Sequence, residues 1–250
     1  MNILIYVITY NSSNKVKNLL YKIPFNYLKK FKYTIYISDD CSKDDTSYQI
    51  KRIKKKLKKK IIYTVNPKRL FYGGNQKKCL NYGIKNKFNI ALMLHGDGQY
   101  NPNNIPVILD SFLKYKDVSA VFGSRMINKK NALRGGMPYY KFFGNILLTK
   151  FQNFILAKNL SEYHSGFRAY RLSSLERIKY KKLSDGFNFD NQIILQLFNK
   201  KMIILEKPIL TFYGNEISHV NGFYYAFLIF IDTLIFALNR IKLIKIKVYS

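Results

Sequence analysis

Short apolar segments rich in Ile, Val, Tyr and Phe alternate with segments of helical periodicity along the first half of the chain. The predicted strands are residues 3–8, 33–38, 61–65, 90–94 and 118–122. The predicted helices between them are residues 14–28, 45–57, 74–85 and 104–115. Because such alternation joins parallel strands by crossover helices, it predicts an α/β fold with a mostly parallel mixed sheet and helices on both faces.

The second half of the chain is less regular. Residues 137–156 and 188–198 are typical of helices, and residues 164–170 and 202–205 are typical of strands. The sequence has no internal repeat and no linker rich in Pro, Gly or Ser, so nothing divides it into separate domains. We therefore predict one domain over residues 1–222, followed by a C-terminal amphipathic helix and a basic tail over residues 223–250.

Polar motifs follow the predicted strands at the points where the strands end. They are Thr9-Tyr10-Asn11, Asp39-Asp40, Asn66 and the segment from His95 through Gly96, Asp97 and Gly98 to Gln99. In sheets of this kind, ligands bind outside the carboxyl ends of the strands. The sequence therefore predicts a ligand site built from these motifs.

The residue types in these motifs favour particular ligands. A carboxylate at a strand end, such as Asp39 or Asp40, accepts hydrogen bonds from a nucleobase or a ribose hydroxyl. Asp97, with glycines on both sides and Gln99 two residues later, is suited to a divalent cation that bridges a diphosphate. The alternative for Asp97 is a turn residue in a glycine-rich loop. The chain contains no GxxxxGK[ST], GxGxxG or GxSxG motif, so the usual signatures of P-loop, Rossmann and α/β-hydrolase proteins are absent.

The chain is strongly basic, with 43 Lys and Arg against 14 Asp and Glu and a net charge of +29. This excess favours an anionic partner such as a nucleic acid, a membrane surface or a phosphorylated substrate, and codon bias in an AT-rich genome is the alternative explanation. The densest basic run, residues 51–60, is predicted to be the solvated face of an amphipathic helix. Cys41 and Cys79 form no CxxC pattern, which favours a reduced, cytoplasmic setting.

The termini contain no segment that clearly crosses a membrane. The apolar N-terminus lacks a basic leader and is predicted to be a buried strand instead of a signal peptide. The longest apolar stretch, residues 223–238, is shorter than the ~20 residues of a bilayer-spanning helix, and Asp232 interrupts it. Basic residues follow it at Arg240, Lys242, Lys245 and Lys247. Packing on the domain and lying on a membrane surface are both open for this helix.

Eight motifs in order carry a resemblance to a known family. They are the opening strand and turn at 3–12, the DDGSxDGT-like segment at 39–46, and Asn66 with 73–75 and 81–83, followed by the DGQ segment at 97–99 with Pro102 and 105–106, GSR at 123–125, SGFRA at 165–169, EKPI at 206–209 and Ser218. In this arrangement the chain resembles the family 2 glycosyltransferases of the GT-A fold. The similarity is greatest to the dolichyl-phosphate and polyprenyl-phosphate sugar synthases, and it extends from residue 3 to about residue 222.

The resemblance implies a role for each matching residue. The nucleotide-sugar donor would be bound by Thr9, Tyr10, Asn11, Asp39, Asp40, Asn66, Gly74 and Gly96. Asp97 and Gln99 would hold Mg²⁺ or Mn²⁺, together with His95, which stands where the family carries the first Asp of a DAD triplet. Arg125 would contact the diphosphate or an acceptor phosphate and is expected to face the cleft. Lys141 falls near a basic position of the acceptor loop. Asp190 is a candidate general base, the alternative being a surface residue at a helix start.

These roles imply an inverting, metal-dependent hexosyltransferase. Its acceptor would be a lipid phosphate or a glycan in cell-envelope synthesis. The enzyme would be located in the cytoplasm or at the inner face of the membrane. Nucleic acid would not be a partner. The chain departs from the family pattern at His95, at Cys41 in place of the DDGS glycine, and at Tyr213, where an RxxGxSK motif would begin with Arg. Glu216 or His219 would then serve the acceptor side. The alternative function is a nucleotide-sugar-binding module that lost catalysis when His95 replaced an Asp.

Overall fold

The structure is a computed structural model that describes residues 1–211, 213 and 221–249. Its strands are β1 (Asn2–Thr9), β2 (Lys32–Asp39), β3 (Ile61–Val65), β4 (Ile90–His95), β5 (Val118–Ser124), β6 (Arg168–Arg171) and β7 (Ile203–Pro208). Its α-helices are α1 (Ser13–Tyr21), α2 (Phe25–Leu28), α3 (Thr46–Leu57), α4 (Phe71–Lys85), α5 (Ile105–Lys114), α6 (Lys129–Arg134), α7 (Tyr139–Leu156), α8 (Leu172–Leu175), α9 (Phe189–Asn199) and α10 (Gly222–Arg240). Two 3₁₀ turns, η1 (Pro102–Asn104) and η2 (Tyr180–Lys182), complete the described elements.

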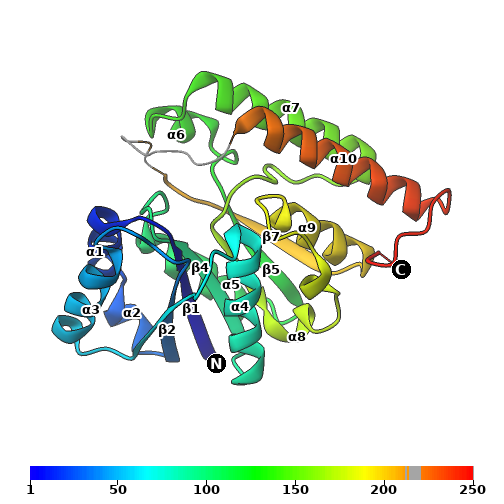
Figure 1. Cartoon of the computed structure of the whole chain (residues 1–250). Helices are drawn as coiled ribbons and strands as arrows, with labels where there is room; N and C mark the ends of the chain where they lie inside the picture. Colours follow the sequence, from blue (N-terminus) through cyan, green and yellow to red (C-terminus); the bar gives the residue numbers. More distant parts are fainter. Residues whose placement is uncertain (212, 214–220, 250) are drawn as a thin grey trace.

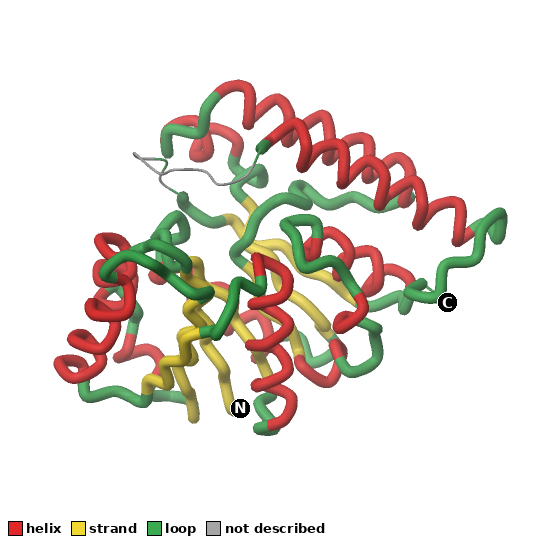
Figure 2. Tube along the Cα trace, viewed as in Figure 1, coloured by secondary structure: helices red, strands yellow, loops and turns green. Residues whose placement is uncertain are grey.

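The strands form one sheet in the order β3-β2-β1-β4-β6-β5-β7. All neighbouring pairs are parallel except those of β6, which runs antiparallel to both β4 and β5. Figure 2 shows the strands in the middle of the molecule with helices around them. The predicted α/β fold with a mostly parallel mixed sheet is therefore confirmed.

Each face of the sheet supports its own hydrophobic core, because successive side chains of a strand point to opposite faces. The odd-numbered residues of β1, from Ile3 to Val7, pack with α1, α3 and α5. The even-numbered residues, from Leu4 to Ile8, pack with α4, α8 and α9. Apolar residues on both faces explain why the central strands are nearly continuous apolar runs in the sequence.

Helices α7 and α10 form an outer layer beyond the sheet (Figure 1). They lie side by side and run in the same direction, since the Phe151 and Phe230 rings stack at 4.8 Å and Arg240 Nη1 donates to Leu156 O. Polar contacts fix α10 to the domain. Gln152 Nε2 donates to Thr233 Oγ1 at 3.2 Å, and Asn188 and Gln192 of the α9 region donate to Asp232 at 2.8 and 2.9 Å.

Three local differences from the predicted elements have physical explanations. The first predicted helix is broken into α1 and α2 at Pro24, which fixes φ and lacks an N–H donor. The predicted strand over 164–170 pairs only from Arg168, because residues before it belong to a loop. The short helices α6 and α8 were not predicted, since four to six residues carry too little periodicity.

The basic run at 51–60 lies on α3 and the turn after it. Ile50 and Ile53 of α3 are buried against the sheet, whereas the lysines and Arg52 of the helix are exposed. The predicted solvated basic face is therefore confirmed. The basic residues lie towards the C-terminal end of α3, and the loop after β2 leads into the other end of this helix.

Candidate active site

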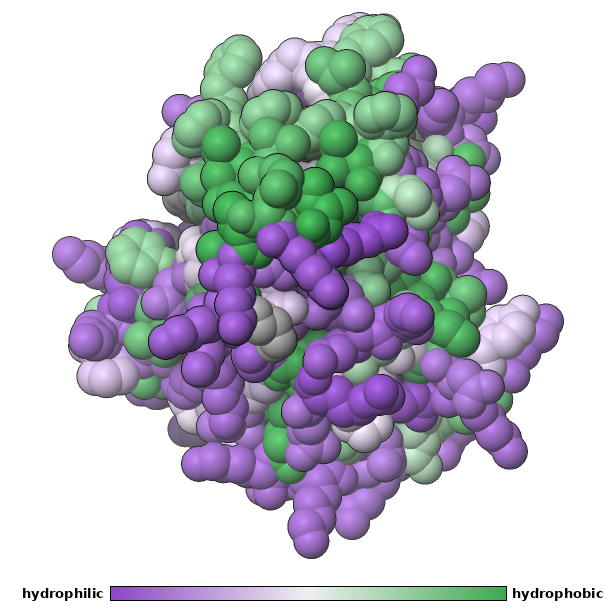
Figure 3. All heavy atoms as spheres, turned by 90° about the vertical axis from the view of Figure 1, so that its right-hand side faces the viewer, coloured by the Kyte–Doolittle hydropathy of each residue, from purple (hydrophilic) through white to green (hydrophobic). Residues whose placement is uncertain are grey.

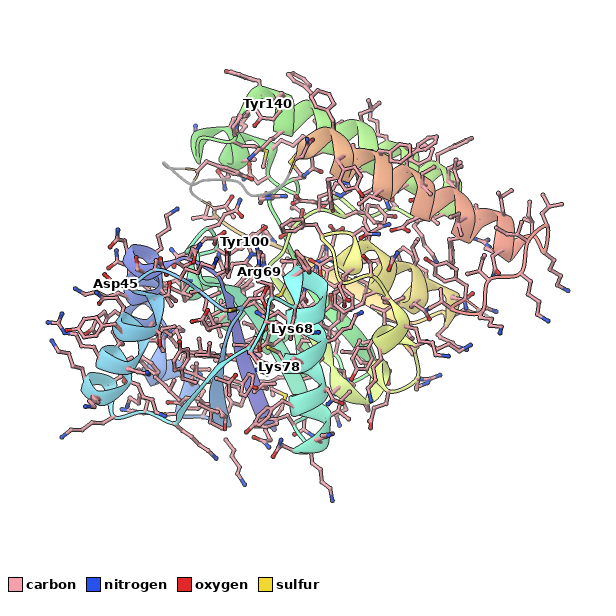
Figure 4. All side chains as sticks on the ribbon, in the orientation of Figure 1. Asp45, Lys68, Arg69, Lys78, Tyr100 and Tyr140 are labelled. Atoms are coloured by element: carbon pink, nitrogen blue, oxygen red, sulfur yellow. The ribbon has the colours of Figure 1, made fainter. Side chains whose placement is uncertain are left out.

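The carboxyl ends of three adjacent strands bring the predicted motifs together. The register pairs Thr9 of β1 with Asp39 of β2 and Ile8 of β1 with His95 of β4. The Asp39–Asp40 pair, the Thr9–Asn11 turn and the His95–Gln99 turn therefore lie at one edge of the sheet. Figure 4 places Arg69 and Tyr100 near this edge and Tyr140 on the layer across from it.

Asp39 and Asp40 are held in different ways. Asp39 is fully buried, and its carboxylate accepts hydrogen bonds from Ser42 N, Ser42 Oγ and Tyr63 OH at 3.0, 2.5 and 2.8 Å. Asp40 accepts from Leu70 N at 2.7 Å, and its Oδ2 lies 3.8 Å from Arg69 Nε. Because Asp39 is completely buried, a direct hydrogen bond from a nucleobase to its carboxylate would require neighbouring side chains to move, although among the described residues Oδ2 accepts only from Tyr63.

Asn66 joins this strand end to α4. Its Nδ2 donates to Asp40 Oδ1 at 2.9 Å and to Asn75 Oδ1 at 3.2 Å, and its Oδ1 accepts from Lys78 Nζ at 2.5 Å. Asn66 is only 1% exposed. These bonds fix the position of Asn66 between Asp40 and α4, and binding of the donor by Asn66 stays a prediction.

The turns after β1 and β2 are linked through residues with left-handed backbone. Asn11 has φ +46°, accepts from Lys43 N at 2.9 Å and takes the Ser42 hydroxyl as acceptor for its own N–H. Cys41 has φ +64°, a conformation that favours glycine. This explains why the resembled DDGS motif carries Gly there, and Cys41 adopts the same turn at some conformational cost.

A cation that the sequence analysis missed lies over the Thr9–Asn11 turn. The Arg69 guanidinium stacks on the Tyr10 ring at 3.7 Å from its centroid and lies 5.2 Å from the Phe71 ring. Its side chain is 45% exposed. The signal was available, because Lys68 and Arg69 follow Asn66 at a strand end, where ligand-binding groups gather.

The turn after β4 packs Gly96, the residue before Asp97, against Thr9. A Cβ on Gly96 would lie 2.4 Å from Thr9 Oγ1, so only glycine fits this approach. Asp97 Oδ1 accepts from Gln99 N at 3.0 Å, with Gly98 between them at φ +74°. Among the described residues no group donates to Asp97 Oδ2. Asp97 is therefore a turn residue and still has a carboxylate oxygen available to a ligand.

His95 points toward the protein interior. Its Nε2 lies 3.2 Å from Gly166 O and 3.4 Å from Tyr72 OH, and its ring packs against Tyr100. A Cβ on Gly166 would lie 2.5 Å from that nitrogen. Metal coordination through Nε2 would therefore displace these contacts, and coordination by His95 stays a prediction.

The donor set suits a hard cation whose other ligands come from a substrate. The described residues contain no group of three His, Cys, Asp or Glu side chains that could hold a metal ion. Asp97 offers a single partly exposed carboxylate. Mg²⁺ is commonly bound through one or two carboxylates plus phosphate oxygens, so the residues present fit a cation that arrives with a diphosphate.

Asp190 lies in the first turn of α9, as predicted, but it is not a surface residue. It is 4% exposed, and its carboxylate accepts from Tyr72 OH at 2.7 Å and from Gln76 Nε2 at 2.8 Å. Arg168 Nε lies 3.8 Å from Asp190 Oδ2. Because Tyr72 OH also lies near His95 Nε2, Asp190 is connected to the turn that carries Asp97.

The glycines at the start of α4 serve packing. Gly73 N donates to Asp185 O at 2.6 Å, and a Cβ on Gly73 would lie 2.5 Å from Ser184 O. A Cβ on Gly74 would lie 3.1 Å from Asp185 Oδ1. The close approach of α4 to this loop accounts for both glycines, and binding of the donor by Gly74 stays a prediction.

Arg125, which was expected to face the cleft, is buried in this structure, and its contact with a phosphate stays a prediction. Arg125 is 8% exposed, and its N and Nε donate to Glu162 at 2.7 and 2.8 Å while Nη1 donates to Tyr213 OH. Burial alone would raise the pKa of Glu162, but the adjacent Arg125 guanidinium overcomes this and lowers the pKa. Glu206 accepts from Ser161 N and Glu162 N and fixes the loop that carries Glu162. The Arg125–Glu162 ion pair is therefore a buried structural contact.

The acceptor-side motif is only partly described. Lys141 Nζ lies 6.0 Å from the centroids of the Tyr140 and Tyr213 rings, on the layer opposite the strand ends. Glu216, Ser218 and His219 lie outside the described residues. The predicted acceptor roles of these three residues stay predictions.

His164 links the Arg125–Glu162 pair to α10, because its backbone oxygen accepts from Arg125 Nη2 and its ring contacts Tyr225. Its burial also makes the stability of the fold depend on pH. Its Nδ1 lies 3.2 Å from Tyr225 OH, and burial lowers its pKa to about 3. In the unfolded chain the pKa of His164 is about 6.5, so in mild acid the unfolded chain binds a proton that the folded chain does not. The stability that the folded chain has above about pH 6.5 is therefore lost as the pH falls. We expect unfolding free energy to drop by about 2 kcal/mol between about pH 7.5 and about pH 5. Urea unfolding measures this, and an equal drop in His164→Gln would contradict it.

Comparison with known sequences identifies relatives of the chain. The sequence profile described as Glycosyl transferase family 2 matches residues 4–179. An uncharacterized protein of Methanocaldococcus jannaschii is 28% identical over 208 residues, which cover 81% of this chain and 86% of that protein. The low-salt glycan biosynthesis hexosyltransferase Agl6 of Haloferax volcanii is 31% identical over 121 residues, which cover 48% of this chain and 28% of that protein.

A further sequence relative and a solved structure are also similar to this chain. Polyprenol monophosphomannose synthase of Mycolicibacterium smegmatis is 22% identical over 139 residues, 55% of this chain and 51% of that protein. The match therefore spans about half the length of this relative and less of Agl6. Glucosyl-3-phosphoglycerate synthase of Mycobacterium tuberculosis, solved with Mg²⁺ and uridine diphosphate, superposes with a TM-score of 0.69 at 13% identity, covering 94% of this chain and 79% of that one. This last similarity establishes the GT-A fold.

Proposed function

The chain belongs to glycosyltransferase family 2, and on that premise we propose that it is an inverting hexosyltransferase using a nucleoside-diphosphate sugar. One observation carries the proposal. The carboxyl ends of β2, β1 and β4 are neighbours, and they place the Asp39–Asp40 pair, the Thr9–Asn11 turn and Asp97 at one edge. This edge is where a sheet of this kind binds a nucleotide.

On the donor side, the nucleoside would lie along the ends of β1 and β2. Tyr10 supplies an aromatic face, and Arg69 supplies a half-exposed cation beside it. Thr9, Asn11, Asp39, Asp40, Asn66 and Gly96 would shape this part of the site. Three of them, Asp39, Asp40 and Asn66, would do so through the hydrogen bonds described above. Arg69 is an exposed cation of this cluster and is suited to a phosphate oxygen or a base edge.

The diphosphate would lie over the turn after β4. Asp97 would hold Mg²⁺ or Mn²⁺ there, with Gln99 as a further oxygen donor. Such a cation neutralises the charge that develops on the leaving diphosphate. The protein's own contribution is to orient the Asp97 carboxylate through Gln99 N and to hold its turn in place by the close packing of Gly96 on Thr9.

The acceptor would approach from the side of α6, α7 and Lys141. A sugar hydroxyl needs a base to remove its proton, for which Asp190 is the proposed residue, whereas an ionised lipid phosphate needs none. The Arg125–Glu162 pair would position the acceptor loop without touching the diphosphate. We propose a lipid-phosphate or glycan acceptor of the cell envelope, with the enzyme acting in the cytoplasm at the inner face of the membrane.

A panel of nucleotide sugars, tested by thermal shift with Mg²⁺ and with Mn²⁺, checks the donor assignment. Bound ligand stabilises the fold by RT ln(1 + [L]/Kd), so the true donor is expected to raise Tm and to do so only with a divalent cation. Failure of every donor to shift Tm would contradict the proposal. A shift without sugar transfer to any acceptor would favour the catalytically inactive binding module instead.

A further inference from the structure

The outer faces of α7 and α10 expose a continuous apolar surface, which we call the α7–α10 face. Its members are Phe143, Leu147 and Phe154 of α7, exposed by 63, 71 and 84%, and Phe223, Phe227 and Phe230 of α10, exposed by 94, 59 and 42%. The spacing places each set on one side of its helix. The stacked rings of Phe151 and Phe230 join the two stripes.

The pictures show the same gathering. Figure 3 shows apolar side chains clustered over the upper part of the molecule, where Figure 1 places α7 and α10, with hydrophilic side chains below them. Contiguous exposed apolar surface of this kind marks an interaction site in a soluble domain.

Charge selects the partner. Residues 125–160 and 222–249 contain Asp232 as their only acidic residue, and Asp232 is held against α9 by Asn188 and Gln192. Exposed basic residues accompany the face: Lys150 lies on α7 and Lys158 follows it, while Arg240 ends α10 and is followed by Lys242, Lys245 and Lys247. A second copy would bring two such sets of basic residues together, whereas an anionic lipid surface complements them.

The way α10 is anchored decides how it meets a bilayer. It is the described helix that is long and apolar enough to cross a membrane. However, Asp232, Thr233 and Tyr225 tie its inner side to Gln192, Gln152 and His164 of the domain. Spanning the bilayer would break these bonds in hydrocarbon, so lying flat with the apolar side outward is favoured.

We propose that the α7–α10 face docks on an anionic lipid bilayer, with both helices in the plane of the interface. The inference deepens the membrane location given under the proposed function and rests on it for its biological setting. It adds that α7, and not only the C-terminal helix, forms the docking surface.

Vesicle flotation of the full chain tests the inference. Wild type is expected to float with vesicles of phosphatidylglycerol in phosphatidylcholine and much less with phosphatidylcholine alone. Leu147→Gln combined with Phe227→Gln, and separately Lys242→Glu combined with Lys245→Glu, should each weaken binding about tenfold or more. All four side chains are exposed, so the fold should persist, which circular dichroism checks.

Matched controls separate position from composition. Tyr48→Gln with Leu113→Gln changes apolar residues of similar exposure elsewhere, and Lys54→Glu with Lys55→Glu makes the same charge change on α3. Equal losses in variants and controls would overturn the inference. So would a wild type that ignores both kinds of vesicle, or a dimer in sedimentation that only the α7–α10 variants dissociate. Donor binding by thermal shift is a separate readout, so its failure would discard the proposed function and not the docking surface.

Discussion

Replacing Asp97 by Ala is expected to reduce sugar transfer about a thousandfold. The cation that Asp97 would hold stabilises the charge developing on the leaving diphosphate in the transition state, by several kcal/mol. We propose two tasks for this side chain, closing the turn and holding the cation. Its Oδ1 accepts from Gln99 N and closes the turn after β4, while no described residue donates to Oδ2. The loss should therefore appear in turnover and also in the divalent-cation dependence of nucleotide binding measured by thermal shift.

Asp97→Asn separates these two tasks. Asn retains an oxygen that accepts from Gln99 N, so the turn should persist, but it lacks the charge that binds a cation. We expect Asn to lose cation-dependent donor binding as Ala does, with a wild-type Tm in the absence of ligand. Asp117→Ala is the matched control, since Asp117 is exposed just before β5 at the opposite end of the sheet. Normal turnover in Asp97→Asn would refute the assignment of the metal ligand.

The position of Asp97 was predictable because local signals determine it. A strand buried on both faces appears as a continuous apolar run, as in β1 and β4, and strand-end residues then gather at one edge. The same reasoning located Asp39, Asp40 and Thr9 without knowledge of any contact. Gly96 and Cys41 show the same local logic, since a close approach and a left-handed φ explain why the resembled motifs carry small residues there.

The contacts that sequence reasoning missed depend on residues far apart in the chain. Glu162 has no periodic or motif signal, yet it pairs with Arg125 from 37 residues away and buries it. Arg69, which follows β3, stacks on Tyr10, which follows β1, although β2 lies between these strands in the sheet. These interactions form only when the chain folds and brings distant loops together. The burial of Arg125 could not be predicted, because the sequence does not reveal Glu162 as its partner. A motif match locates a residue, and its packing decides what the residue can touch.

Replacing Asp190 by Asn is expected to distinguish the two classes of acceptor. With a sugar hydroxyl as acceptor, loss of the base should lower kcat by about a hundredfold to ten-thousandfold, because general-base catalysis contributes that much. With an ionised lipid phosphate, kcat should change little. The measurement is kcat and kcat/KM against pH for each acceptor, since a base also produces an acid limb in the profile that Asn removes.

Two further variants show whether the effect of Asp190 is chemical. Tyr72→Phe removes the hydroxyl that donates to Asp190 but keeps the carboxylate, so the acid limb should survive. Asp232→Asn changes a half-buried acid outside the proposed site that accepts from two amide side chains, and it should leave kcat unchanged. If Asp190→Asn lowers Tm and kcat together while the acid limb remains, Asp190 is only a structural partner of Arg168 and Gln76. An unaltered rate with both acceptors would remove it from the reaction and leave ionisation of the acceptor itself as the source of the nucleophile.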